Sequence, residues 1–141
     1  MKWISRGIAL AIVVVVFGNN CDLRGQAKER KLKVYYVSIG AETLTPVTSA
    51  NIEMRGRHCE VRSTKDIYAI TDVLDSARSI SQEFSDKTVR VKLIEASDTG
   101  DKLLALVENH GEVRFATGKE GTISPRGMAT IKKVIEAQCR Q

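Results

Sequence analysis

The N-terminal segment, residues 1–27, constrains the fold most, because it has the pattern of a segment that is removed. Lys2 and Arg6 precede an apolar run of 10 residues, and a polar stretch follows that ends at the small residue Ala27. A positive start, an apolar middle and small residues before a cleavage point are typical of a secretory signal. We therefore expect residues 28–141 to form the exported protein, in the periplasm or outside the cell.

Two other fates of this segment stay open. A retained signal anchor fits less well, because a membrane-spanning helix needs roughly 20 apolar residues and this run has 10. Lipidation at Cys21 also fits less well, because Gly18, Asn19 and Asn20 precede it where a leucine and two small residues are expected. We expect no stable membrane span after signal cleavage.

Signal removal changes the charge of the chain. The whole sequence has a formal net charge of +5, and the segment removed contains three basic residues and one acidic residue, which leaves +3. Proteins that bind nucleic acid usually show clustered Lys and Arg with interleaved aromatic side chains. The densest basic run, Lys28 to Lys33, lies at the new N-terminus, so we expect no nucleic-acid partner.

The cysteines agree with export. Once Cys21 leaves, Cys59 and Cys139 remain, and an even pair in an oxidising compartment favours one disulfide. The bridge would close a loop of about 80 residues, for which chain entropy gives roughly 4–5 kcal/mol. We predict this disulfide as a structural staple of a small domain.

Periodicity predicts strands over most of the chain. Residues 31–39 are apolar on both faces, which is typical of a strand covered on two sides. Residues 44–62 are less regular and could hold two short strands, 50–54 and 58–61. Strands at 87–96, 102–108 and 113–117, joined by turns at 97–101 and 109–112, predict an antiparallel meander.

Two helices complete the pattern. Ser63 caps a helix whose apolar residues recur at spacings of three and four, and residues 79–85 are expected to fray, with Ile80 and Phe84 on the core. Ser124 and Pro125 begin a second helix that ends at Cys139. The predicted fold class is α+β: a two-layer sandwich with a mostly antiparallel sheet, the meander plus the N-terminal strand, and both helices on one face.

Catalytic patterns are weak in this sequence. A thiol nucleophile at Cys59 would need a base, but the adjacent His58 points to the opposite face of a strand, which leaves only His110. We predict no metal site and no cofactor, because the histidines lack metal-ligand spacing and Asp98 and Asp101 fit a polar turn.

The surface offers the remaining candidates for function. Arg90 and Lys92 are expected to face outward from their strand, and Arg114 could continue them as a basic stripe on the sheet. The loop at Asn109 and His110 is a natural second contact element, because exposed loops on rigid hairpins often bind partners.

Together these observations favour a non-enzymatic exported binding protein, with a protein or an anionic envelope polymer as partner. Two alternatives stay open: a small cell-envelope hydrolase without a recognisable motif, and a polyanion-binding module.

Overall fold

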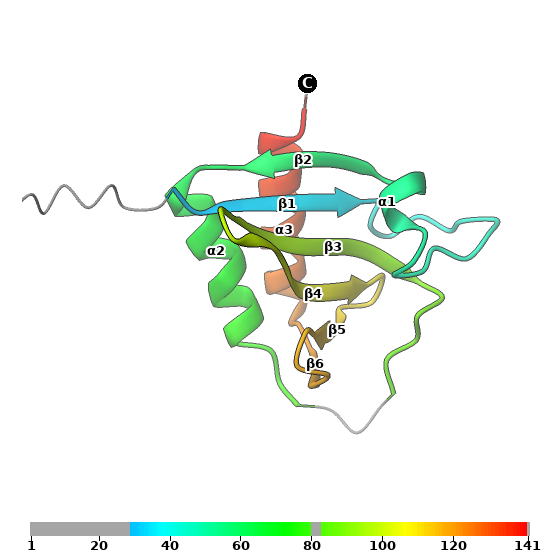
Figure 1. Cartoon of the computed structure of the whole chain (residues 1–141). Helices are drawn as coiled ribbons and strands as arrows, with labels where there is room; N and C mark the ends of the chain where they lie inside the picture. Colours follow the sequence, from blue (N-terminus) through cyan, green and yellow to red (C-terminus); the bar gives the residue numbers. More distant parts are fainter. Residues whose placement is uncertain (1–28, 80–82, 141) are drawn as a thin grey trace, which may run out of the picture.

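The structure is a computed structural model that describes residues 29–79 and 83–140 (Figure 1). The predicted signal segment, with Cys21 and the cleavage point, lies outside the described residues, as does Ile80. The elements in chain order are β1 (Lys31–Tyr36), α1 (Ile52–Arg55), β2 (Arg57–Val61), α2 (Thr64–Asp75), β3 (Val89–Ser97), β4 (Gly100–Glu108), β5 (Glu112–Phe115), β6 (Glu120–Thr122) and α3 (Pro125–Gln138).

The described strands form one antiparallel sheet in the order β2-β1-β3-β4-β5-β6, which Figure 1 shows from top to bottom. β1 lies between β2 and β3, as its two apolar faces predict; Leu32 pairs with Val61 on one side and with Glu95 on the other. The predicted meander is confirmed as β3, β4 and β5. The α+β class is confirmed as a six-stranded antiparallel sheet with three helices.

Both long helices begin at the predicted caps. The Ser63 hydroxyl accepts a hydrogen bond from the backbone N–H of Asp66 at 3.4 Å, and the Ser124 hydroxyl accepts one from Gly127 at 3.1 Å. These bonds satisfy N–H groups that the first turn of a helix leaves unpaired. α2 and α3 contact each other, and a Cβ atom on Gly127 of α3 would lie 2.9 Å from the side chain of Val73 in α2.

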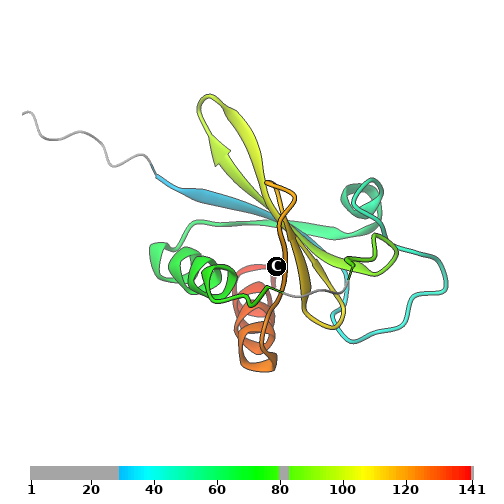
Figure 2. The same cartoon turned by 90° about the horizontal axis from the view of Figure 1, so that it is seen from below.

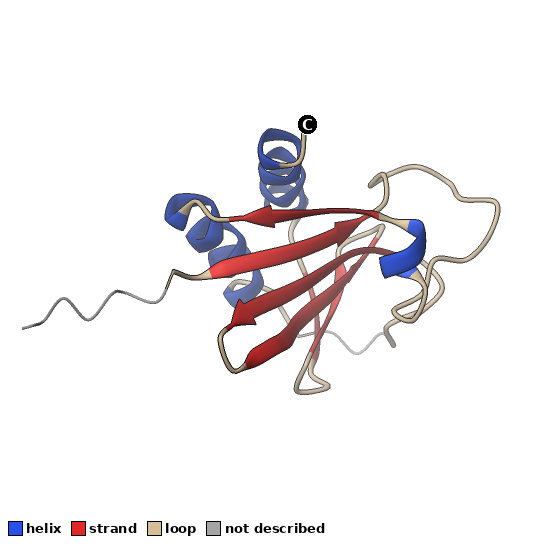
Figure 3. Cartoon of the chain, turned by 45° about the horizontal axis from the view of Figure 1, so that its top comes forward, coloured by secondary structure: helices blue, strands red, loops and turns tan. Residues whose placement is uncertain are grey.

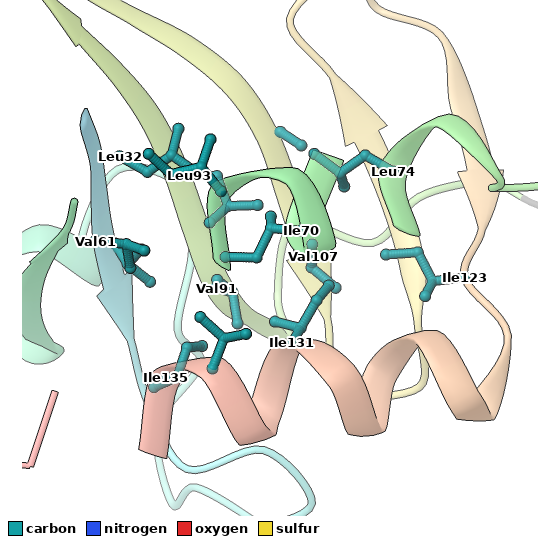
Figure 4. Close-up of a cluster of buried hydrophobic side chains, with 14 of the residues drawn as sticks. Leu32, Val61, Ile70, Leu74, Val91, Leu93, Val107, Ile123, Ile131 and Ile135 are labelled. Carbon is teal, nitrogen blue, oxygen red and sulfur yellow. The ribbon is translucent and has the colours of Figure 1, made fainter. Parts of the chain in front are cut away.

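The main core joins α2 and α3 to the sheet (Figure 4). It consists of buried aliphatic side chains from both helices and from five strands, including Leu32, Val61, Ile70, Leu74, Val91, Leu93, Val107, Val113, Ile131 and Ile135. Burial of each such side chain stabilises the fold by about 1.5–3 kcal/mol.

A smaller cluster is separate from the main core; on β4, Leu106 belongs to it, whereas the flanking Ala105 and Val107 belong to the main core. Val47, Ile52, Phe84, Val89 and Leu106 are buried in it, and α1 contributes Ile52. Figure 2 shows α1 across the sheet from α2 and α3. Phe84 is therefore buried as predicted, but outside the main core.

Two parts of the chain differ from the prediction. The prediction of a strand at 50–54 is wrong, because residues 52–55 form the one-turn helix α1, seen at the right of Figure 3. Asn51 favours this helical turn, since its side-chain oxygen accepts a hydrogen bond from the backbone N–H of Thr48 at 2.8 Å. β6 was not predicted, because only three residues take part. It pairs with β5 and, through Thr122, with Arg78.

The predicted disulfide is confirmed. Cys59 in β2 and Cys139 at the end of α3 are bonded, with their Cα atoms 5.4 Å apart. The bridge ties the last turn of α3 to an outer strand of the sheet. In the described part of the chain, no helix has the length and apolar character needed to cross a membrane. The disulfide is compatible with export.

Candidate functional site

Arg90 does not face solvent. The expectation that it projects outward is wrong, because its exposed fraction is 3%. A register shift lies between Val89 and Val91, which belong to different clusters, so the period of two breaks at Arg90. Its guanidinium donates to the carbonyl oxygen of Ala41 at 3.0 Å and to that of Val89 at 3.2 Å.

Lys92 and Arg114, the other two basic residues of the predicted stripe, form ion pairs with carboxylates of the domain. The Lys92 ammonium lies 2.5 Å from a carboxylate oxygen of Glu53 and thereby ties α1 to the sheet. Arg114 donates to Glu120 at 3.0 Å and lies over the Phe84 ring, 4.5 Å from its centre. The charged ends of all three predicted residues therefore have partners inside the protein.

The two residues of the predicted contact loop, Asn109 and His110, have different environments. His110 is exposed at the turn between β4 and β5. The side-chain oxygen of Asn109 instead accepts a hydrogen bond from the backbone N–H of Gly40 at 2.6 Å. Asn109 and Arg90 thus both hold the chain that follows β1.

That chain forms an exposed loop, residues 41–46, which projects beside α1 in Figures 1 and 2. Arg90 holds its first residue, as described above. At its other end, Arg55 and Asn51 donate to the carbonyl oxygen of Pro46, at 3.1 and 3.2 Å, and Arg55 also donates to the Thr45 hydroxyl. The 41–46 loop is therefore fixed at both ends by side chains from outside it.

Leu44 lies between these two anchors and is fully exposed. Met54 of α1 is 83% exposed and Tyr68 of α2 is 57% exposed, so Leu44 is the most exposed large apolar side chain among the described residues. Sequence reasoning missed this loop, because Leu44 stands in a segment without periodicity. The available signal was a single leucine among Thr43, Thr45 and Pro46.

Cys59 cannot act as a thiol nucleophile while it is in the disulfide with Cys139. His58 stacks on the ring of Tyr35 with a centroid distance of 5.7 Å, on the other side of β2 from Cys59, and His110 lies in the β4–β5 turn.

Carboxylates are spread among separate contacts. Asp101 is paired with Lys33 at 2.6 Å, and residues 29–79 and 83–140 contain no group of three His, Cys, Asp or Glu side chains that could hold a metal ion. Glu108 is 5% exposed, and burial raises the pKa of its carboxyl, although the backbone N–H of Ser85 donates to it and offsets part of that effect. Glu108 thereby anchors the segment that leads into β3.

Comparisons with protein-family models, with curated proteins and with solved structures found no match to this chain.

Proposed function

We propose that residues 28–141 act, after export and signal cleavage, as a non-enzymatic binding protein that contacts a protein partner through the 41–46 loop. The observation that carries the proposal is the full exposure of Leu44 in a loop whose two ends are held by side chains from the sheet and from α1. We also infer that the domain is a two-layer sandwich, because α2 and α3 bury their apolar side chains in one cluster with the strands.

The energetics of the loop favour binding. Moving a leucine side chain from water into an apolar pocket of a partner contributes about 1.5–3 kcal/mol. A mobile loop would lose part of this gain when it becomes ordered, and a loop already held in place loses less. The hydrogen bonds from Arg90 and Arg55 act in this way, because each is made before a partner arrives.

The predicted basic stripe does not favour a polyanion partner, because the charged groups of Arg90, Lys92 and Arg114 already have partners within the domain. The hydrolase alternative has lost Cys59 as its nucleophile. Export is supported by the signal pattern and by the disulfide, since disulfides persist in oxidising compartments.

Site-specific crosslinking in the producing cells tests the proposal. A photoreactive amino acid, p-benzoylphenylalanine, replaces Leu44 in one variant and the exposed Tyr68 in a control variant. We expect one discrete adduct from position 44 that position 68 does not give. With the crosslinked partner purified, Leu44→Asp should weaken binding at least about 10-fold, in line with the burial of one leucine, and Tyr68→Asp should leave binding unchanged.

Three outcomes would contradict the proposal: no adduct from position 44, the same adducts from both positions, or unchanged affinity of the Leu44→Asp variant. A thermal melt of each variant checks that its fold is intact. Leu44 is fully exposed, so its substitution should not change the melting temperature.

A further inference from the structure

A cleft of about 590 Å³ lies where the chain leaves β1 beside the last turns of α3. Its apolar wall comes from Ile39, Ile135 and the disulfide-bonded Cys139. The volume lies within the roughly 300–1,000 Å³ that is usual for sites of small organic ligands.

Three cations surround this apolar wall. Arg57 comes from β2, Lys132 from α3 and Arg140 from the chain just after α3. Glu136 is the one acidic residue among the described residues that line the cleft. Among the described residues, no carboxylate lies within ion-pair distance of any of the three. The cleft therefore carries an excess of positive charge.

A second cleft on the molecule also contains basic side chains, but two of them are paired with carboxylates. It lies at the other end of β1, and there Lys33 is paired with Asp101 and Arg30 with Glu95, at 2.6 and 2.9 Å. Its charges neutralise one another. Of these two clefts, only the one beside α3 combines three cations that have no ion-pair partner among the described residues.

The fold fixes the positions of these cations. Arg57 and Cys59 are two residues apart on β2, so both lie on the side of the sheet that faces α3. The disulfide holds the end of α3 against β2 and so keeps Lys132 and Arg140 near Arg57. The carboxyl end of a helix is partially negative and would repel an anion, and these two side chains counteract that field.

We propose that this cleft binds a small organic anion that combines a carboxylate or phosphate group with an apolar tail. Arg57 and Lys132 bind the charged group, with the planar guanidinium suited to two parallel hydrogen bonds. The tail lies along Ile39, Ile135 and the disulfide. The proposal is independent of the 41–46 loop, which lines no part of this cleft.

Titration with decanoate, followed by the backbone amide signals of the full mature protein, tests the proposal. We expect saturable shifts at Ile39, Arg57 and Cys139. Inorganic phosphate, which has no tail, and decyl maltoside, which has no charge, should each bind at least 10-fold more weakly. Arg57→Gln and Lys132→Gln should each weaken decanoate binding about 10-fold, because each removes one contact to the charged group.

Lys133→Gln is the matched control, because Lys133 is exposed on the same helix but does not line the cleft. It should leave the affinity unchanged. Equal binding of decyl maltoside, equal losses from Lys132→Gln and Lys133→Gln, or no decanoate binding up to millimolar concentration would each overturn the proposal. Leu44→Asp should not affect decanoate binding, so failure here and failure of the loop proposal are distinguishable.

Discussion

Replacing Arg90 with methionine separates the stability of the fold from the order of the 41–46 loop. The substitution keeps an unbranched apolar stem and removes a guanidinium that is 3% exposed. That group makes two hydrogen bonds, to Ala41 and to Val89. Its Nε atom has no hydrogen-bond partner among the described residues, and no carboxylate there forms an ion pair with it.

The energy terms nearly cancel for the whole fold. Hydrogen bonds from a charged donor contribute about 1.5–3 kcal/mol each, so the two bonds contribute about 3–6 kcal/mol. Burying a cation costs several kcal/mol, and an unpaired buried donor costs about 1–3 kcal/mol more. We therefore expect the free energy of unfolding of Arg90→Met to differ from wild type by less than about 1.5 kcal/mol, as measured by urea denaturation.

The loop should respond differently. Loss of the bond to Ala41 lowers the free energy of local opening by about 1.5–3 kcal/mol, which predicts amide hydrogen exchange about 10- to 150-fold faster. The amides to follow are those of Gly40 and Ala41, which are bonded to Asn109 and Ser38. Arg114→Met is the matched control, because it removes a guanidinium from the same sheet without touching this loop.

Two results would refute this reasoning. A loss of more than 3 kcal/mol in global stability would mean that the Arg90 guanidinium is strongly stabilising despite its burial. Unchanged exchange at Gly40 and Ala41, or equal acceleration in Arg114→Met, would mean that Arg90 does not hold the loop.

Three further predictions concern the fold. The double variant Cys59→Ala/Cys139→Ala should lose up to about 4.5 kcal/mol of stability, the chain-entropy value for its separation of 80 residues, and dithiothreitol should have the same effect on wild type but none on the variant. Gly127→Ala should lower the stability of the fold by about 1–3 kcal/mol in thermal melts, because the added Cβ would lie 2.9 Å from Val73. Alanine favours helices over glycine, so a rise in melting temperature would show that this contact is not as close as described. Because the pKa of Glu108 is raised in the folded state, the stability of the wild type should fall as the pH rises from about 4.5 through that pKa. Denaturation curves between pH 4 and 7 should show no such fall for Glu108→Gln. The same dependence of stability on pH in the variant and the wild type would contradict this prediction.

The regular elements could be predicted because their signals are local. Hydrophobic period and caps at Ser63 and Ser124 specify α2 and α3, and alternation specifies the strands of the meander. The pairing of Cys59 with Cys139 was predicted from the expected signal cleavage, since removal of Cys21 would leave one possible pair. Elements of three or four residues, α1 and β6, have too few positions to show a period.

The candidate sites depend on contacts between distant parts of the chain. Sequence alternation placed Arg90 on the surface, and a register shift in β3 buried it against Ala41, 49 residues away. Nothing local to Leu44 indicates that Arg55 and Arg90 hold its loop, and nothing local to Arg57 indicates that Lys132 shares its cleft. The sequence by itself determined the export pattern, the fold class and the disulfide, because these follow from residue type and spacing. Only the tertiary structure decided which cations are engaged and which side chains are exposed, because burial and charge pairing depend on what the rest of the chain brings into contact.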